Sequence, residues 1–446
     1  MKKFIFSVLI GGFVGVALGA AFLYIVPRLP TIFAQAFFYP AYDVISIFDR
    51  ASILRPYAPA EDQYIIKTVD KSIPQEGKVV YADLADMRIV LFENGSQISE
   101  YPIKSIGREG TAWQTPLGIF EMSYKKENHF SSIGSVWMPY SMHFFGNYFI
   151  HGWPYYPDGM PVAEGYSGGC IRLATPDAGE IFEFVDSNTQ LIVASTHAPI
   201  DTDVQFEYRR TDTPDIQSDY VVVDIDSGEV IASRASQEQQ NIGSFAKLMN
   251  VLISLETLNQ YQETIFDQNI VTIADVLYPV LMQADNEAAT ILFQHKNKGQ
   301  YIEDMNTRAQ SLGMINTSYA DALGTNSQTV STLDDVVKLF MYFYEYKPFM
   351  IKALNQNTYT KNSLNIKNNF DFENGTYRAG FVDQDNTLAL GLIQKDFEKK
   401  TTNEEGVEQI ETLSKNILII VKDSIDAQKD LRDIRAWLDQ SVSVIY

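Results

Sequence analysis

The longest apolar run of the chain covers residues 4–26 and contains only Ser7 and Tyr24 as side chains with polar groups. A helix rises about 1.5 Å per residue, so such a run would span roughly 34 Å, enough for the hydrocarbon core of a bilayer. Lys2 and Lys3 precede the run and Arg28 alone follows it closely. This bias predicts a single-pass anchor over residues 1–27 that leaves the rest of the chain outside the cytoplasm. Small residues at 17–21 leave a cleaved signal peptide as the alternative.

After the apolar run, the pattern of hydrophobic positions changes twice. Residues 28–77 are punctuated by prolines and have loop composition, which indicates a stalk. Short runs with apolar and β-branched residues then predict strands over 78–83 and 87–92, and a turn at Asn94-Gly95 leads into a further strand over 97–101. The spacing predicts a short helix over 177–186 and a closing strand over 190–194. Together these elements predict a mostly-β domain over residues 78–196.

A second domain follows a change in composition. Residues 197–217 are rich in Asp and Thr and poor in apolar side chains, which predicts a linker. Beyond it, strands are expected over 220–225 and 230–233. Helical spacing predicts a helix over 244–258, and further helical segments follow. Strands return over 387–393 and 417–421 with a charged loop between them, and a helix is expected over 427–439. Strands at both ends with helices between predict an α/β domain over residues 218–446, with helices packed on an antiparallel sheet.

Composition and charge exclude some classes of function. The 446 residues carry a formal net charge of -21, and no stripe of Lys and Arg is visible, so nucleic acid is not expected as a partner. The sequence contains no His-Glu-x-x-His, no Cys-x-x-Cys and no phosphate-binding loop, and it therefore predicts no metal site and no cofactor.

Cys170 is the only cysteine of the chain. Cysteines of exported proteins normally pair, but a single one cannot pair within its own chain, so it is either an inert buried thiol or a reactive one. His151 stands nineteen residues earlier, and a histidine can act as the base that a thiol nucleophile needs. A lone histidine on an aromatic strand is also often structural. Arg172 could favour the thiolate or brace the loop.

Three motifs in order give the first domain a family resemblance. They read Thr115-Pro-Leu-Gly-Ile-Phe120, then His151-Gly152, then Ser167-Gly-Gly-Cys170-Ile-Arg172. Residues 78–195 resemble the catalytic domain of the L,D-transpeptidases, the YkuD family. One position departs from the pattern, because Gly168 stands where that family usually has a histidine.

This resemblance implies a two-step acyl transfer on peptidoglycan stem peptides. Cys170 would attack the carbonyl of the third stem residue, and His151 would act first as general base and then as acid. The Gly152 carbonyl would orient the imidazole, and backbone N–H groups near Gly169 and Cys170 would form the oxyanion hole. An amine of a second stem would complete a 3→3 cross-link, whereas water would only trim D-alanine. The alternative is a non-catalytic peptidoglycan-binding protein.

The second domain carries a Ser-x-x-Lys motif, Ser244 and Lys247, whose spacing places both side chains on one helix face. Residues 218–446 resemble the serine D-alanyl-D-alanine carboxypeptidases of the penicillin-binding and β-lactamase fold. Asn286 and Arg378 fit the second and third motifs of that family. Both motifs are incomplete, because Ala284 replaces a serine and Ala379 a threonine. The sequence therefore favours a non-catalytic second domain; the alternative is a serine D,D-carboxypeptidase that works through Ser244 and Lys247.

Overall fold

The computed structural model describes residues 66–67, 72–187, 189–195, 207–361, 364–402 and 408–445. The predicted anchor and most of the predicted stalk lie outside these residues. Within the described part of the chain, no helix has the length and apolar character needed to cross a membrane.

The N-terminal domain, as the structure describes it over residues 72–195, contains two sheets and one helix. In the first sheet the strand order is β3-β2-β1-β9-β4, and all neighbours are antiparallel except the parallel pair β1 and β9. The bounds are β1 (Lys78–Asp83), β2 (Arg88–Glu93), β3 (Ser96–Pro102), β4 (Gly118–Glu121) and β9 (Gln190–Ala194). The expected strands at 78–83, 87–92, 97–101 and 190–194 are thus confirmed to within a residue or so.

The second sheet of this domain has the order β5-β6-β7-β8, and its last pair is parallel. Its strands are β5 (Tyr124–Ser131), β6 (Val136–Phe145), β7 (Tyr148–His151) and β8 (Ile171–Arg172), and helix α4 (Thr175–Phe184) follows. The helix expected at 177–186 begins two residues earlier, because Pro176 occupies the first turn, where its missing N–H costs nothing.

The C-terminal domain, described over residues 207–445 with short gaps, is built on an antiparallel sheet in the order β12-β11-β21-β20-β19. The strands are β11 (Asp219–Asp224), β12 (Glu229–Arg234), β19 (Tyr377–Val382), β20 (Ala389–Thr402) and β21 (Glu408–Lys422). Four two-stranded ribbons accompany it: β10 (Glu207–Arg210) with β22 (Val442–Ile445), β13 (Gln240–Asn241) with β16 (Val330–Ser331), β14 (Glu263–Phe266) with β15 (Asn269–Thr272), and β17 (Thr358–Lys361) with β18 (Leu364–Lys367).

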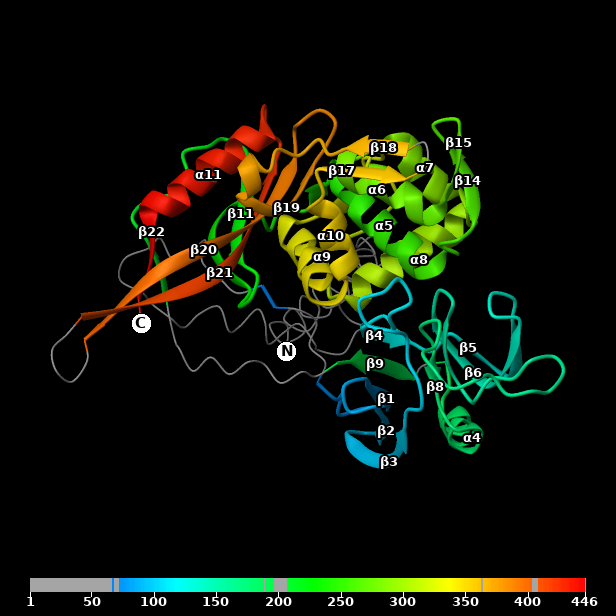
Figure 1. Cartoon of the computed structure of the whole chain (residues 1–446). Helices are drawn as coiled ribbons and strands as arrows, with labels where there is room; N and C mark the ends of the chain where they lie inside the picture. The colour runs from blue at the N-terminus through cyan, green and yellow to red at the C-terminus, as the bar shows by residue number, and fades with distance from the viewer. Residues whose placement is uncertain are drawn as a thin grey trace, which may run out of the picture. The chain divides into compact units, whose positions relative to one another are not determined.

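Helices cover both faces of this central sheet. Their bounds are η3 (Gly243–Phe245), α5 (Ala246–Thr257), α6 (Ile273–Gln283), α7 (Asn286–Gln294), α8 (Lys298–Ser311), α9 (Leu333–Tyr346), α10 (Pro348–Leu354), η4 (Glu373–Gly375) and α11 (Ala427–Ser441). Helix α11 contacts β20 and β21 on one face, whereas α6, α9 and α10 contact the sheet from the other (Figure 1). The α/β architecture expected for the second domain is therefore confirmed.

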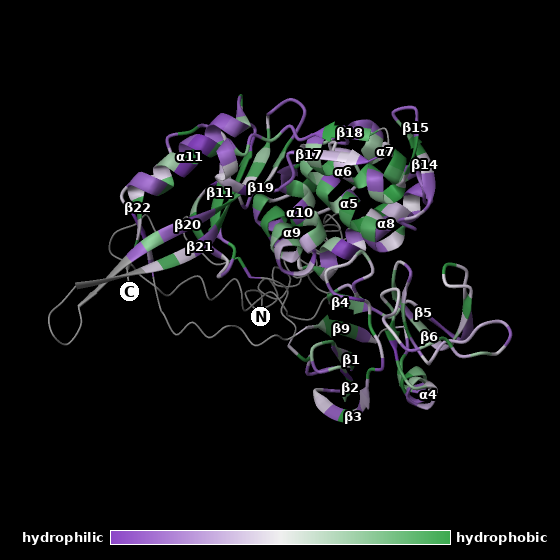
Figure 2. Cartoon of the chain, viewed as in Figure 1, coloured by the Kyte–Doolittle hydropathy of each residue, from purple (hydrophilic) through white to green (hydrophobic). Residues whose placement is uncertain are grey.

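Alternation along the strands explains these layers, because successive side chains point to opposite faces. On β11, Val221 and Val223 join the core under the large helical layer, while Tyr220 and Val222 join the core beneath α11. Figure 2 shows α11 with hydrophilic residues outward, whereas α5 is largely hydrophobic. Every residue of α5 is buried, so the helix expected at 244–258 lies inside the domain and not on its surface.

Two other expectations need correction. The strand expected at 387–393 continues to Thr402, and the strand expected at 417–421 already begins at Glu408. Charged residues that suggested a loop therefore belong to two long paired strands. Part of the predicted linker is strand β10, which pairs with β22 and buries Tyr208. Pairing partners far away in sequence stabilise both segments, and local composition does not reveal them.

Candidate active sites

Strands β7 and β8 bring the first set of candidate residues together. Cys170 directly precedes β8, and the parallel pairing sets Ile150 opposite Ile171 and His151 opposite Arg172. Ile150 and Ile171 are fully buried in the main core. They fix the register, because a slip by one residue would turn apolar side chains out of the core.

Cys170 and His151 lie on the same face of this sheet. Cys170 packs against Phe149 in a small apolar cluster on the face opposite to Ile150. His151 follows Phe149 by two positions, so its side chain points to the same face. The structure therefore brings the predicted nucleophile and the predicted base onto adjacent strands.

The His151 imidazole is held in one tautomer. Its Nδ1 lies 2.6 Å from the carbonyl oxygen of Gly152, and a carbonyl can only accept, so Nδ1 carries the proton. The lone pair of Nε2 is then left to act as a base. Burial lowers the pKa of His151 from 6.5 to about 4, and the hydrogen bond to Gly152 opposes this shift only in part. The ring is therefore neutral at neutral pH.

The Cys170 thiol is partly exposed and protonated in this arrangement. Its Sγ donates to the carbonyl oxygen of Asn147 at 3.7 Å. Burial raises the pKa of the thiol from 9.0 to about 11, against the opposing effects of a backbone hydrogen bond at Phe149 and the charge of Arg172. The resting pair is thus a neutral thiol and a neutral imidazole.

Of the two glycines before Cys170, one leaves no room for a side chain and the other does. Gly169 has φ +106°, and a Cβ there would lie 2.1 Å from a ring carbon of Tyr148, so only glycine fits. At Gly168 the nearest atom to such a Cβ is a ring carbon of Trp113, at 3.9 Å. The backbone therefore has space for a side chain at the position where the family usually has histidine.

One part of the expected oxyanion hole needs correction. The Gly169 N–H donates to the Ser167 hydroxyl at 3.0 Å, and this hydroxyl donates to the Cys170 carbonyl at 2.5 Å. A second hydroxyl, that of Thr115, donates to the Gly169 carbonyl at 2.9 Å. These bonds fix the loop but use the Gly169 donor, whereas the Cys170 N–H has no acceptor among the described residues.

Gly152 and Arg172 frame this site. A Cβ on Gly152 would lie 3.0 Å from the Thr175 Cα, so the strand end packs closely on the start of α4. The Arg172 guanidinium lies 5.9 Å from the centre of the Trp153 ring, within range of a cation–π contact. Burial lowers the pKa of Arg172 from its ordinary value, yet an arginine stays protonated, so it contributes a positive charge beside Cys170.

The second candidate site places Ser244 beside Lys247, as the motif predicts. Ser244 lies in the turn η3, and Lys247 lies in the first turn of α5 with only 2 % of its surface exposed. The Lys247 Nζ lies 2.7 Å from the Ser244 Oγ and 3.3 Å from the Leu323 carbonyl oxygen. Burial lowers the pKa of Lys247 from 10.5 to about 8, although three aspartates oppose the shift. An appreciable fraction of this amine is therefore neutral near pH 8 and available to accept a proton.

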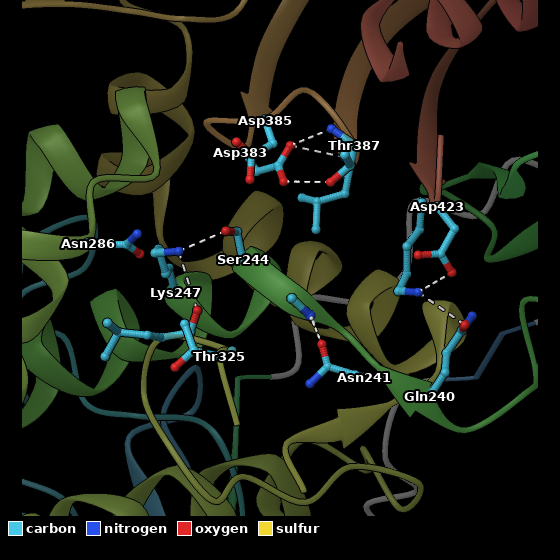
Figure 3. A pocket seen from close by; sticks show the side chains of 15 residues that line it. Gln240, Asn241, Ser244, Lys247, Asn286, Thr325, Asp383, Asp385, Thr387 and Asp423 are labelled. Atoms are coloured by element: carbon cyan, nitrogen blue, oxygen red, sulfur yellow. Dashed lines mark hydrogen bonds and ion pairs between the residues drawn. The ribbon is translucent and has the colours of Figure 1, made fainter. Parts of the chain in front are cut away.

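A cavity of about 410 Å³ opens over this pair (Figure 3). Asn286 lines it and places its amide 3.5 Å from the Gln384 side chain. Arg378 does not line it; the side chain is exposed on β19 and bonds to Gln394. Ala379 and Gly380, the rest of the proposed third motif, are buried. The structure therefore unites Ser244, Lys247 and Asn286 and leaves Arg378 outside.

Several residues of the two sites carried no sequence signal. Asp383, Asp385 and Asp423 line the cavity, together with Lys422. They come from the ends of strands, where acidic side chains are common, so no spacing singled them out. Asn147 belongs to the tight turn Gly146-Asn147 between two strands, a composition that turns favour for purely local reasons.

Comparisons with known proteins agree with this division of the chain. A family model described as the L,D-transpeptidase catalytic domain matches residues 77–193, and one described as D-alanyl-D-alanine carboxypeptidase matches residues 259–387. The first span contains Cys170 and His151; the second contains Asn286 but begins after Ser244 and Lys247.

Individual proteins are similar to parts of the chain. The D-alanyl-D-alanine endopeptidase of Haemophilus influenzae is 28 % identical over 204 residues, which is 40 % of this chain and 70 % of that protein. The protein of the same name from Escherichia coli is 29 % identical over 145 residues, 28 % of this chain and 47 % of that protein. Penicillin-binding protein D2 of Listeria monocytogenes, solved with cefotaxime, is 19 % identical with a TM-score of 0.41, over 51 % of this chain and 98 % of that one.

The two family matches follow one another along the chain without overlap. They coincide with the β-rich fold around Cys170 and with the α/β fold around Ser244. The chain thus joins a domain of the L,D-transpeptidase family to a domain of the D-alanyl-D-alanine carboxypeptidase family.

Proposed function

We propose that this protein is an L,D-transpeptidase that acts on peptidoglycan stem peptides through Cys170. The observation that carries the proposal is the fixed tautomer of His151, which leaves the Nε2 lone pair free of a proton on a side chain that shares a sheet face with Cys170. A neutral imidazole beside a neutral thiol can take the proton as sulfur attacks, the arrangement that general-base catalysis needs.

The reaction has two halves. Sγ of Cys170 attacks the carbonyl carbon of the third stem residue while Nε2 of His151 takes the thiol proton. The tetrahedral intermediate collapses, His151 returns the proton to the departing amine, and D-alanine leaves behind a thioester. The amine of a second stem then attacks the thioester carbonyl and loses a proton to His151. The C–S bond breaks, His151 returns the proton to Sγ of Cys170, and the 3→3 cross-link is released. The Cys170 N–H, which has no acceptor among the described residues, would stabilise each oxyanion.

The proposed reaction takes place outside the cytoplasm. Stem peptides lie outside the cytoplasm, so the apolar run at residues 4–26 would hold both domains on the outer side of the membrane. The test uses the full chain in detergent with a disaccharide-tetrapeptide, with products identified by mass spectrometry. Release of D-alanine with 3→3 dimers, abolished by Cys170→Ala and retained by Ser244→Ala, is the expected result. A parent protein that binds the stem peptide but never turns it over would leave a binding protein instead.

A second activity, as a serine peptidase on D-alanyl-D-alanine peptides, is favoured by one specific observation. Lys247 lies 2.7 Å from the Ser244 hydroxyl with a pKa of about 8, under an open cavity. The incomplete motifs argued for a non-catalytic domain, but this pair retains the geometry of an activated nucleophile. Relatives called D-alanyl-D-alanine endopeptidase are consistent with it.

Covalent labelling tests this second activity. A fluorescent penicillin should acylate the parent at Ser244, and Ser244→Ala should abolish the label. Lys247→Ala should slow labelling by about a hundredfold or more, since removal of a general base costs roughly 10² to 10⁴ in rate. Lys422→Ala is the matched control, because Lys422 lines the same cavity but bonds to Gln240. An unlabelled parent would leave the second domain without this activity.

A further inference from the structure

The two domains belong to one compact unit, and a buried arginine joins them. Arg308 on α8 is fully buried, and its Nη1 donates to the Leu117 carbonyl of the N-terminal domain at 2.8 Å. The same guanidinium pairs with Glu256 on α5, with 2.9 Å between Nε and Oε2. Lys347 Nζ lies 3.0 Å from the other oxygen of Glu256. Charges buried this completely hold their partners in one geometry, because a displaced partner would leave an unpaired charge.

A second contact between the domains lies beside the nucleophile. The Asn147 side-chain amide donates to the Thr257 carbonyl, the last residue of α5, at 2.7 Å. The backbone carbonyl of the same asparagine accepts the Cys170 thiol. The neighbouring Gly146 has φ +54°, and a Cβ there would lie 2.8 Å from the Thr257 methyl group. Only glycine fits at this close approach, so the turn is shaped to the end of α5.

A third contact reaches the glycines that precede Cys170. The Trp113 ring stacks on Tyr261 of the C-terminal domain, with 6.4 Å between the ring centres and 29° between the planes. The Trp113 carbonyl oxygen would lie 3.1 Å from a Cβ on Gly169. The second domain therefore contacts two of the segments that surround the thiol.

From these contacts we infer that the C-terminal domain positions the nucleophile of the N-terminal domain. Asn147 is the positioning residue: its side chain is anchored on the end of α5, and its carbonyl holds the Cys170 thiol. The inference deepens the proposed function and rests on it for the acyl-transfer reaction. The contacts themselves concern only the reactivity of the thiol, which can be measured separately.

The test exploits the fact that Cys170 is the only cysteine of the chain. Alkylation of the full-length protein by iodoacetamide, followed by mass spectrometry, reports on this thiol alone. Asn147→Ala leaves the accepting carbonyl in place but removes its anchor. Alkylation should become faster, because the carbonyl no longer holds the thiol proton. The expected factor is about five, since one hydrogen bond is worth about 1 kcal/mol. Acyl transfer should become slower by at least the same factor, because Sγ is no longer fixed relative to His151.

Asn369→Ala is the matched control. Asn369 is also exposed, and its side-chain amide donates to the Gln283 carbonyl at the end of α6, far along the chain from Cys170. Its loss should leave both rates unchanged. A merely structural role for Asn147 would lower the melting temperature and loosen the whole site, so alkylation would approach the rate of the protein in urea instead of rising only about fivefold.

Tyr261→Ala keeps the inference falsifiable if Asn147→Ala does not fold. Tyr261 is 76 % exposed, so its removal costs little buried surface, and alkylation should rise about twofold, as expected for an aromatic contact near 0.5 kcal/mol. Ile425→Ala, at a fully exposed position, is its control. Alkylation rates equal to the parent in both test variants would overturn the inference. A changed alkylation rate in a protein without transpeptidase activity would overturn the proposed function and retain the inference.

Discussion

Each of the two candidate sites contains a buried ionisable group, and burial shifts the pKa values of these two groups in opposite directions. Burial raises the pKa of the Cys170 thiol to about 11 and lowers the pKa of Lys247 to about 8. Desolvation always favours the neutral form, so it keeps the proton on a thiol but removes it from an amine. The cysteine is therefore quiet at rest, whereas the base beside Ser244 is already close to its neutral form.

The two groups therefore need different steps before they can react. The Cys170 thiol donates to a backbone carbonyl at Asn147, so in the proposed reaction its proton moves to His151 when a substrate arrives. Ser244 already bonds to its base. Helix α5 connects the two candidate sites. Lys247 lies in its first turn, and Thr257, which contacts Asn147, lies at its end, about 15 Å away at 1.5 Å per residue.

Removal of the proposed base of the cysteine site should have the largest effect. His151→Gln should lower the rate of acyl transfer by about 10² to 10⁴, the usual contribution of general-base catalysis, and leave penicillin labelling of Ser244 unchanged. Product formation from the disaccharide-tetrapeptide measures it. His143→Gln is the control, since this half-buried ring also bonds to a backbone carbonyl, that of Gly146. An equal loss in the control would mean that the ring of His151 is only structural.

The next largest effect concerns the arginine that joins the domains. Arg308→Ala leaves the buried Glu256 with only Lys347 as a cationic partner, and should reduce the free energy of unfolding by about 3–5 kcal/mol. The midpoint of urea unfolding, followed by tryptophan fluorescence, measures the change. Arg432→Ala removes a half-exposed partner of Glu373 and should cost at most about 1 kcal/mol. Similar midpoints for both variants would show that the domains are joined by apolar packing rather than by this ion cluster.

Much of the fold could be predicted from local sequence patterns. Strands β1, β2, β3 and β9 are short runs with apolar and β-branched residues, flanked by turn residues, so their bounds were found almost to the residue. The pair Cys170 and His151 and the pair Ser244 and Lys247 were also found, because each forms part of a short ordered motif. These features share one property: the residues that specify them are close together in the sequence.

Features that depend on distant partners could not be predicted. Strand β10 has linker composition and forms because β22, more than 200 residues later, pairs with it. Arg378 fits a motif in sequence, but alternation along β19 turns it outward and leaves the cavity to residues such as Asp383. Asn147 matters because it touches Thr257 and Cys170 at once. No local pattern contains such contacts.

The pH dependence of alkylation tests whether burial controls the pKa of the Cys170 thiol. The thiolate is the alkylated species, so the rate for Cys170 should rise with pH until about pH 11. At pH 8 it should be about a hundredfold below that of a thiol with the ordinary pKa of 9.0, because each pKa unit is a factor of ten. The charge of Arg172 opposes this shift, and Tyr148, whose pKa burial raises, lies close enough for a charge on Cys170 to raise that pKa further. The same protein in urea supplies the unperturbed reference. A plateau below pH 8 would mean that Arg172 outweighs burial and that the resting site holds a thiolate.

Restoring the serine hydroxyl that is missing at Ala284 should have the smallest effect. Ala284 stands where the related carboxypeptidases have a serine, at the end of α6 in a left-handed conformation with φ 49°. Ala284→Ser restores this hydroxyl and should speed penicillin labelling of Ser244 by no more than about tenfold, or 1.4 kcal/mol, because Lys247 already lies beside the nucleophile. Ala288→Ser, also fully buried, controls for the cost of burying a hydroxyl. A gain of a hundredfold or more would mean that the missing hydroxyl, not the neutral lysine, limits the site, so that burial of Lys247 alone does not prepare Ser244 to react.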